Sequence, residues 1–96
     1  MSIRNYIKVA RKVKAIVQSI DPEAKVYLFG SAARGEATGA SDIDVMVVTS
    51  MIERKYEMMV KVYKALDEPV ELHVTTPEMV SRWYRRFIKE EELIEA

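Results

Sequence analysis

The chain has 96 residues, of which 49% are hydrophobic, with no cysteine and a formal net charge of zero. A chain of this length has room for one modest core, so we expect a single domain over residues 1–96. The absence of cysteine excludes a disulfide scaffold and a cysteine-based zinc site, and charges interrupt every apolar run before it could span a membrane; we therefore expect a cytoplasmic protein without a signal peptide.

An amphipathic helix is predicted at the start of the chain. Apolar residues recur there at three- and four-residue spacing from residue 3 to residue 20, with basic residues between them. Asp21-Pro22 ends this helix, because the residue before a proline is disfavoured in the helical conformation. Residues 25–29 follow as a buried strand, which ends at Gly30.

A short polar segment separates this strand from the next. Ser31 is placed to cap a single helical turn that extends to Arg34, and residues 35–40 have the composition of a loop. Residues 41–48 are apolar except at their start and form the second strand. This connection is shorter than a parallel crossover requires, so we expect the first two strands to form an antiparallel or splayed pair.

A second long helix is predicted from Ser50 to about Leu66. Ser50-Met-Ile-Glu53 has the pattern of a capping box, in which the first and fourth side chains satisfy free backbone N–H groups. The apolar residues expected on its buried face are Ile52, Tyr56, Met59, Val60, Tyr63 and Leu66.

The rest of the chain contains a third strand and a final helix. Residues 70–75 alternate strictly between apolar and polar side chains, which is typical of a half-buried strand. Thr76-Pro77 is a helix start, with an apolar stripe from Val80 to Ile88 and an acidic end that frays or meets a partner. The order of elements predicts an α/β (α+β) fold with helices packed on a small mixed three-stranded sheet.

Two acids in the second strand have an unusual setting. Asp42 and Asp44 lie two residues apart, so their side chains point to one face, while Ile43, Val45 and Val47 point into the core. Carboxylates in an apolar strand need a cation, a proton or dense hydrogen bonding, and oxygen ligands favour Mg²⁺ or Mn²⁺. If the third strand pairs beside the second, Glu71 joins them, and three carboxylates can hold two metal ions for nucleotidyl transfer.

The turn before these acids is suited to phosphate. Gly30 allows close approach of the backbone, and the amides that follow, together with the Ser31 hydroxyl, can bind phosphate oxygens. Arg34 lies one turn later and can neutralise phosphate or brace the loop. The sequence therefore predicts a nucleoside triphosphate site with N–H donors on one side and metal carboxylates on the other.

At these residues the chain resembles a known family. Gly-Ser-x-x-Arg-Gly from Gly30, followed by Ser-Asp-Ile-Asp-Val from residue 41, is similar to the signature of minimal nucleotidyltransferases in the DNA polymerase beta-like superfamily. The resemblance implies that Gly30 and Ser31 bind phosphate, that Asp42 and Asp44 are metal ligands, and that Glu71 is the third carboxylate, a position that is often Asp.

The resemblance also implies a substrate and a partner. Many minimal members resemble antitoxins encoded beside a HEPN-domain toxin, a small helical ribonuclease, and some transfer AMP from ATP to a tyrosine of that toxin. By this resemblance the chain is an Mg²⁺-dependent enzyme that uses ATP, carries two metal ions, and acts as the antitoxin of a HEPN-type toxin.

Other interpretations stay open from the sequence alone. The domain can be a non-catalytic module that masks a toxin, or it can direct nucleotidyl transfer to RNA through Arg82, Arg85 and Arg86; zero net charge makes nucleic acid the weaker choice. Assembly as a homo- or hetero-oligomer is not decided. A lone histidine on a strand is more often structural than functional, so His73, which shares a face with Glu71, is left out of the metal set.

Overall fold

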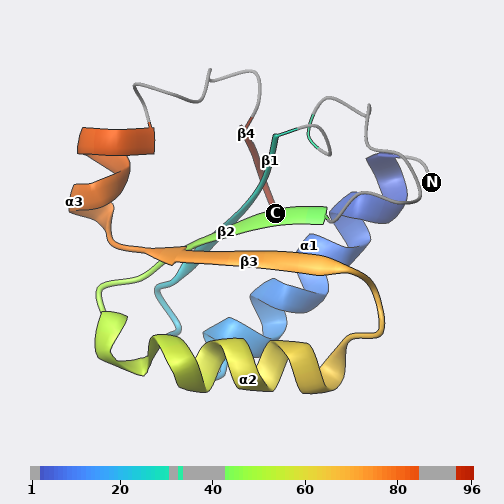
Figure 1. Cartoon of the computed structure of the whole chain (residues 1–96), viewed down its shortest axis with the longest axis horizontal. Coiled ribbons are helices and arrows are strands. Elements are labelled where there is room, and N and C mark those ends of the chain that lie inside the picture. Colours follow the sequence, from blue (N-terminus) through green and yellow to red (C-terminus); the bar gives the residue numbers. More distant parts are fainter. Residues whose placement is uncertain (1–2, 31–32, 34–42, 85–92) are drawn as a thin grey trace.

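The computed structural model describes residues 3–30, 33, 43–84 and 93–96 of the chain. Its helices and strands in chain order are α1 (Ile3–Gln18), β1 (Lys25–Phe29), β2 (Ile43–Val48), α2 (Lys55–Ala65), β3 (Val70–Thr75), α3 (Pro77–Met79) and β4 (Leu93–Glu95), as Figure 1 shows. A 3-10 turn over Ile52–Arg54 precedes α2, and a π-helical turn over Val80–Tyr84 follows α3. Among these residues, no helix is both long enough and apolar enough for a membrane crossing.

The strands of the described residues form one mixed sheet in the order β3-β2-β1-β4. β2 and β3 run parallel, and β1 is antiparallel to both of its neighbours, β2 and β4. The mixed sheet and the antiparallel pairing of the first two strands are therefore confirmed. α2 provides the crossover that a parallel pair of strands requires.

The fourth strand corrects the prediction of a three-stranded sheet. We expected the acidic tail to end a helix, whereas its last residues form β4, with Ile94 opposite Leu28 and the Ala96 N–H donating to the Val26 carbonyl at 2.9 Å. β4 satisfies backbone groups along the outer edge of β1, which would otherwise lack partners. Local periodicity does not reveal such pairing, because the pairing depends on β1, which lies far away in the sequence.

One face of the sheet carries the hydrophobic core and packs against α1 and α2, which lie on the same side of the sheet in Figure 1. Strand residues in this core are Val26, Leu28, Ile43, Val45, Val47, Val70 and Leu72, and the buried residues that the two helices supply include Tyr6, Val9, Ala10, Val13, Val17, Met58 and Val62. The predicted inward alternation of Ile43, Val45 and Val47 is confirmed. Their neighbours in sequence point to the other face of the sheet.

The end of α1 is tied to the end of β2. The helix stops at Gln18, and the Asp21 N–H still donates to the Val17 carbonyl at 2.9 Å. Asp21 is buried and accepts hydrogen bonds from the Thr49 hydroxyl at 2.5 Å and from the Glu23 N–H at 3.0 Å. The Asp-Pro pair therefore ends the helix as predicted, and its carboxylate also anchors the chain where β2 ends.

The buried face of α2 differs from the predicted one. Met58 and Val62 are fully buried, whereas Tyr56 is 75% exposed and Val60 is 52% exposed. The helix starts at Lys55 after a 3-10 turn and has no side-chain cap, so the predicted capping box is also wrong. Apolar residues lie on both sides of this helix, and the periodicity alone could not decide which side faces the sheet.

The start of the final helix is as predicted. The Thr76 hydroxyl accepts a hydrogen bond from the Met79 N–H at 3.3 Å, and Pro77 occupies the first helical position. This helix changes to a π-helical turn from Val80. Phe87 and Ile88 of the predicted apolar stripe, together with Arg85 and Arg86, lie outside the described residues.

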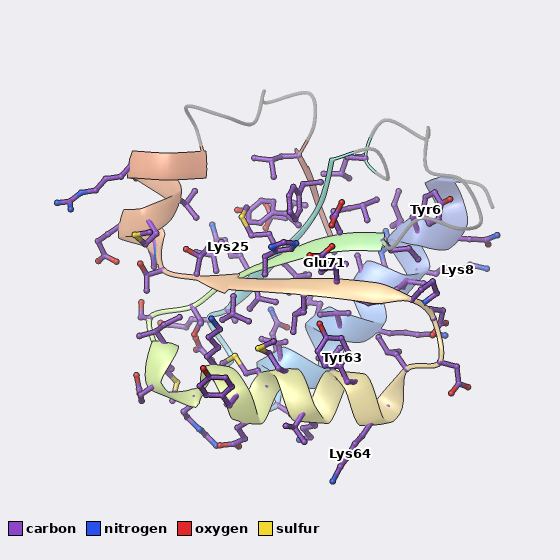
Figure 2. All side chains as sticks on the ribbon, in the orientation of Figure 1. Tyr6, Lys8, Lys25, Tyr63, Lys64 and Glu71 are labelled. Carbon is purple, nitrogen blue, oxygen red and sulfur yellow. The ribbon has the colours of Figure 1, made fainter. Side chains whose placement is uncertain are left out.

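Three contacts hold the start of β3. Lys12 of α1 donates to the Glu68 carboxylate at 2.8 Å, and this hydrogen bond lowers the pKa of Glu68 below its ordinary value. The Ile43 N–H of β2 donates to the Pro69 carbonyl at 2.7 Å. On the outer edge of the sheet, the Leu72 N–H donates to the Tyr63 hydroxyl at 3.0 Å, and Figure 2 shows Tyr63 between α2 and β3. The bond from Ile43 ties the start of β3 to β2, and the other two tie this region to α1 and α2.

The corrected face of α2 can be tested with two matched substitutions. Val62→Ala should lower the free energy of unfolding by about 1–3 kcal/mol, because it opens a cavity in the core. Val60→Ala, the same change at an exposed position of the same helix, should stay within about 0.5 kcal/mol of the parent. Urea unfolding of both variants measures the difference, and an equal loss in the two would contradict the orientation of α2.

Candidate functional site

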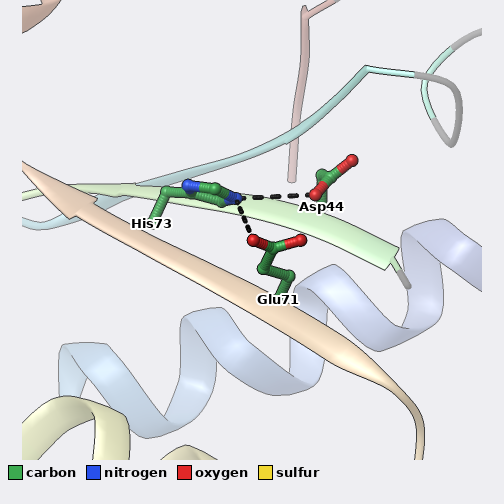
Figure 3. Close-up of side chains that lie close together, drawn as sticks. All are labelled: Asp44, Glu71 and His73. Atoms are coloured by element: carbon green, nitrogen blue, oxygen red, sulfur yellow. Dashed lines mark ion pairs between the residues drawn. The ribbon is translucent and has the colours of Figure 1, made fainter.

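Parallel pairing of β2 with β3 brings three polar side chains to one face of the sheet. Asp44 is opposite Glu71 in the ladder, and Met46 is opposite His73. Since Val45 and Leu72 point into the core, their neighbours Asp44, Glu71 and His73 point to the opposite face, away from α1 and α2 (Figure 3). The predicted juxtaposition of Asp44 and Glu71 is therefore present in the structure.

The three side chains converge on one point. His73 Nε2 lies 3.5 Å from Asp44 Oδ1 and 3.7 Å from Glu71 Oε1, the two contacts drawn dashed in Figure 3. One ligand atom from each residue lies within 4.8 Å of the others. The Asp44 side chain is 27% exposed and that of Glu71 is 55% exposed, so the cluster is partly screened from water but still open to a ligand.

His73 belongs to this cluster, although it is not among the predicted metal ligands. Its Nε2 atom is buried and has no hydrogen-bond partner among the described residues. Its ring meets the ring of Phe29 edge-on, with a centroid separation of 5.0 Å and an interplanar angle of 78°. Its place on the same strand face as Glu71 follows from the sequence, but its approach to Asp44 depends on the pairing of β2 with β3.

Gly30, which directly follows β1, lies beside the cluster. Its φ of +70° lies in the left-handed region, which glycine enters without the steric cost that other residues incur. A Cβ atom built on Gly30 would lie 3.1 Å from Asp44 Oδ2, so the glycine backbone lies directly against this carboxylate. The Ala33 N–H donates to the Gly30 carbonyl at 3.1 Å, which continues the turn toward the polar segment.

The structure brings together half of the predicted site. Gly30, Asp44 and Glu71 meet as expected. Ser31, Arg34 and Asp42 lie outside the described residues, so their predicted roles stay predictions.

The chemistry of the donor set is that of a cation site. Two carboxylates converge on the same point as an imidazole nitrogen, and carboxylates that approach one another are stabilised by a positive charge between them. Aspartate, glutamate and histidine are ordinary ligands of divalent metal ions. Asp44, Glu71 and His73 therefore fit a divalent cation, and Gly30 lies directly beside the Asp44 carboxylate.

The same sheet face continues into a cavity of about 460 Å³. Lys25, Tyr27 and Val48 contribute from the strands, and Pro77 and Val80 contribute from α3 and the turn after it. Tyr27 of β1 pairs with Met46 of β2, and Met46 pairs on its other side with His73 of β3. A volume of this size is in the range of small-molecule sites, but none of the lining residues belongs to the cluster of Asp44, Glu71 and His73.

Comparison with known proteins identifies the family. The family model described as a nucleotidyltransferase domain matches residues 10–96. The crystal structure of an inferred nucleotidyltransferase has a TM-score of 0.69 and 31% sequence identity, covering 90% of this chain and 95% of that one. A second inferred nucleotidyltransferase, from Sulfolobus solfataricus, has a TM-score of 0.67 and 26% identity, covering 97% of this chain and 80% of its own. No curated protein matches the chain.

Substitution of Gly30 tests the turn. Gly30→Ala should lower the free energy of unfolding by about 1–2 kcal/mol, because an L-residue in the left-handed region carries that cost. The new methyl group should also displace the Asp44 carboxylate. Urea unfolding of Gly30→Ala in the parent and in an Asp44→Ala background separates the two effects, since only the backbone cost persists in the second. A Gly30→Ala variant as stable as the parent would contradict the positive φ.

Proposed function

Since the chain belongs to the nucleotidyltransferase domain family, we propose that it transfers a nucleoside monophosphate, AMP from ATP, to a hydroxyl group of a partner protein in the cytoplasm. The observation that carries this proposal is the convergence of Asp44 and Glu71 on one point beside Gly30. Carboxylates next to a glycine turn suit a phosphate chain and its counter-ion.

The proposed reaction is an in-line displacement at the α-phosphorus. The acceptor hydroxyl oxygen forms a bond to this phosphorus, and the bond between the phosphorus and the oxygen bridging to the β-phosphate breaks. Pyrophosphate leaves with the electron pair of the broken bond. The hydroxyl proton passes to a carboxylate, which we assign to Glu71 because it is the more exposed of the two and the more accessible to an incoming acceptor.

A divalent cation, Mg²⁺ in the first instance, fits the donor set, and Asp44 and Glu71 would hold it. When bound, it supplies positive charge to the phosphate oxygens and to the leaving pyrophosphate. Asp42 is the further ligand that the family resemblance implies, and it would allow a second ion. Gly30 lets the phosphate chain approach the backbone, and Ser31 and Arg34 are the proposed phosphate donors beyond it.

The proposed partner is a HEPN-type toxin, with the chain as its antitoxin. This part of the proposal comes from the resemblance to minimal nucleotidyltransferases. One feature of the described residues supports a protein partner: α2 exposes Tyr56 and Val60 to solvent. Exposed aromatic and apolar side chains on one helix are typical of protein contacts.

The same exposed face favours a second candidate, a module that neutralises its partner by binding alone. The two functions differ in what they require of Asp44. Neutralisation that persists without this carboxylate would favour the binding module, whereas loss of neutralisation together with AMP transfer would favour the enzyme.

Asp44→Asn tests the catalytic proposal. The variant should transfer AMP at least about a hundredfold more slowly, because loss of one anionic ligand removes several kcal/mol of charge stabilisation. The assay incubates the chain with Mg²⁺, the protein encoded beside it and ATP labelled at the α-phosphate; intact mass spectrometry of the acceptor counts added AMP groups. ATP labelled at the γ-phosphate should leave no label on the acceptor, which distinguishes nucleotidyl from phosphoryl transfer.

The control is Asp67→Asn, the same chemical change at an exposed aspartate in the turn before β3. It should keep the parent rate. Full transfer by Asp44→Asn, or no mass gain by the parent chain with any nucleoside triphosphate, would contradict the proposal.

A further inference from the structure

The Nε2 atom of His73 lies close to two carboxylates but within hydrogen-bond distance of neither. Nε2 is 3.5 Å from one carboxylate oxygen and 3.7 Å from another. Both separations exceed the 2.7–3.2 Å typical of an N–H···O hydrogen bond. They match the separations of roughly 3–4 Å between neighbouring ligand atoms around an ion with bonds of about 2.1 Å. The imidazole nitrogen is therefore close enough to each carboxylate to share a cation with it.

The burial of Nε2 supports the same interpretation. The atom is buried and has no hydrogen-bond partner among the described residues. A buried polar atom without a partner costs about 1–3 kcal/mol, so such atoms are rare unless a water or an ion meets them. A cation between the imidazole and the two carboxylates would satisfy all three groups.

The imidazole is also held in place. Its edge-on contact with Phe29 sets the ring on the sheet face, and Phe29 directly precedes Gly30, which lies against Asp44. One segment of β1 therefore positions both the imidazole and the carboxylate. Positioned side chains lose less conformational freedom when they bind an ion.

We propose that His73 is a nitrogen ligand of the metal site formed with Asp44 and Glu71, and that it shifts the preference of this site from Mg²⁺ toward a first-row transition-metal ion. Imidazole nitrogen binds ions such as Co²⁺ well, whereas Mg²⁺ prefers oxygen ligands only. The chain has one histidine and no cysteine, so no other imidazole or thiolate of the protein can supply this preference. The inference rests on the proposed function, because it concerns the same site.

The decisive test uses the native sequence, free of any histidine tag, loaded with Mn²⁺. Electron spin echo envelope modulation should show coupling of the Mn²⁺ electron spin to an imidazole nitrogen. Since His73 is the sole histidine, labelling histidine with ¹⁵N should replace the ¹⁴N pattern by that of ¹⁵N. Bound Mn²⁺ without nitrogen coupling, or no Mn²⁺ binding at all, would overturn the inference.

A substitution measures the preference itself. His73→Gln replaces the nitrogen with an amide oxygen of similar reach. The ratio of the Mg²⁺ to the Co²⁺ dissociation constant, measured by titration calorimetry, should fall about tenfold or more, because removing groups at a metal site typically costs that much. Asp67→Asn should leave the ratio unchanged, and circular dichroism checks that each variant is folded. An unchanged ratio in folded His73→Gln would overturn the inference.

The outcomes separate this inference from the proposed function. AMP transfer without nitrogen coupling would retain the function and reject the ligand role of His73. Nitrogen coupling without AMP transfer to any acceptor would retain the metal site and reject the function.

Discussion

Two backbone hydrogen bonds frame the part of the molecule on which the site depends. The Ile43 N–H donates to the Pro69 carbonyl at 2.7 Å where β2 and β3 begin, and the Thr49 N–H donates to the Thr75 carbonyl at 2.9 Å where they end. Between these bonds the strands run parallel and in register. A slip of one residue would turn the side chains of β3 to the opposite face, placing Glu71 in the core and Leu72 in solvent. The apolar core thus enforces the position of the acids.

The site draws on three neighbouring strands of the sheet, in the order β3-β2-β1. β2 supplies Asp44, β3 supplies Glu71 and His73, and the end of β1 supplies Phe29 and Gly30. β1 is antiparallel to β2, so its C-terminal end lies beside the N-terminal end of β2. This topology brings the glycine turn to the carboxylates. In the proposed function, the carboxylates would therefore bind a metal ion and the adjacent glycine turn would bind a phosphate chain.

One face of the sheet carries the hydrophobic core, and the other carries the candidate functional site. The face toward α1 and α2 is filled by apolar side chains, while the opposite face holds the polar cluster and the cavity beside it. Catalytic groups on strands are held more rigidly than groups on loops, because the ladder and the core both constrain them. α2 contributes to the core with Met58 and Val62, while Tyr56 and Val60 of the same helix are exposed.

Much of this arrangement follows from the sequence alone. The alternation in residues 70–75, the Asp-Pro helix end and the Thr76 cap are local signals, and local geometry decides them. The glycine turn and the position of Asp44 in the second strand could also be predicted, because an acid in an apolar strand and a glycine break have few structural explanations. The family comparisons agree with the activity class that these residues predicted.

Only the tertiary structure decided the rest. Which side of α2 faces the sheet depends on its packing against α1 and β3, since apolar residues lie on both sides of that helix. β4 pairs with the edge of β1 and supplies partners for its backbone groups. The sequence of the acidic tail does not indicate this pairing. His73 joins the carboxylates because strand register and the ring of Phe29 place its Nε2 between them. A single histidine in a sequence has no such neighbours until the strands pair.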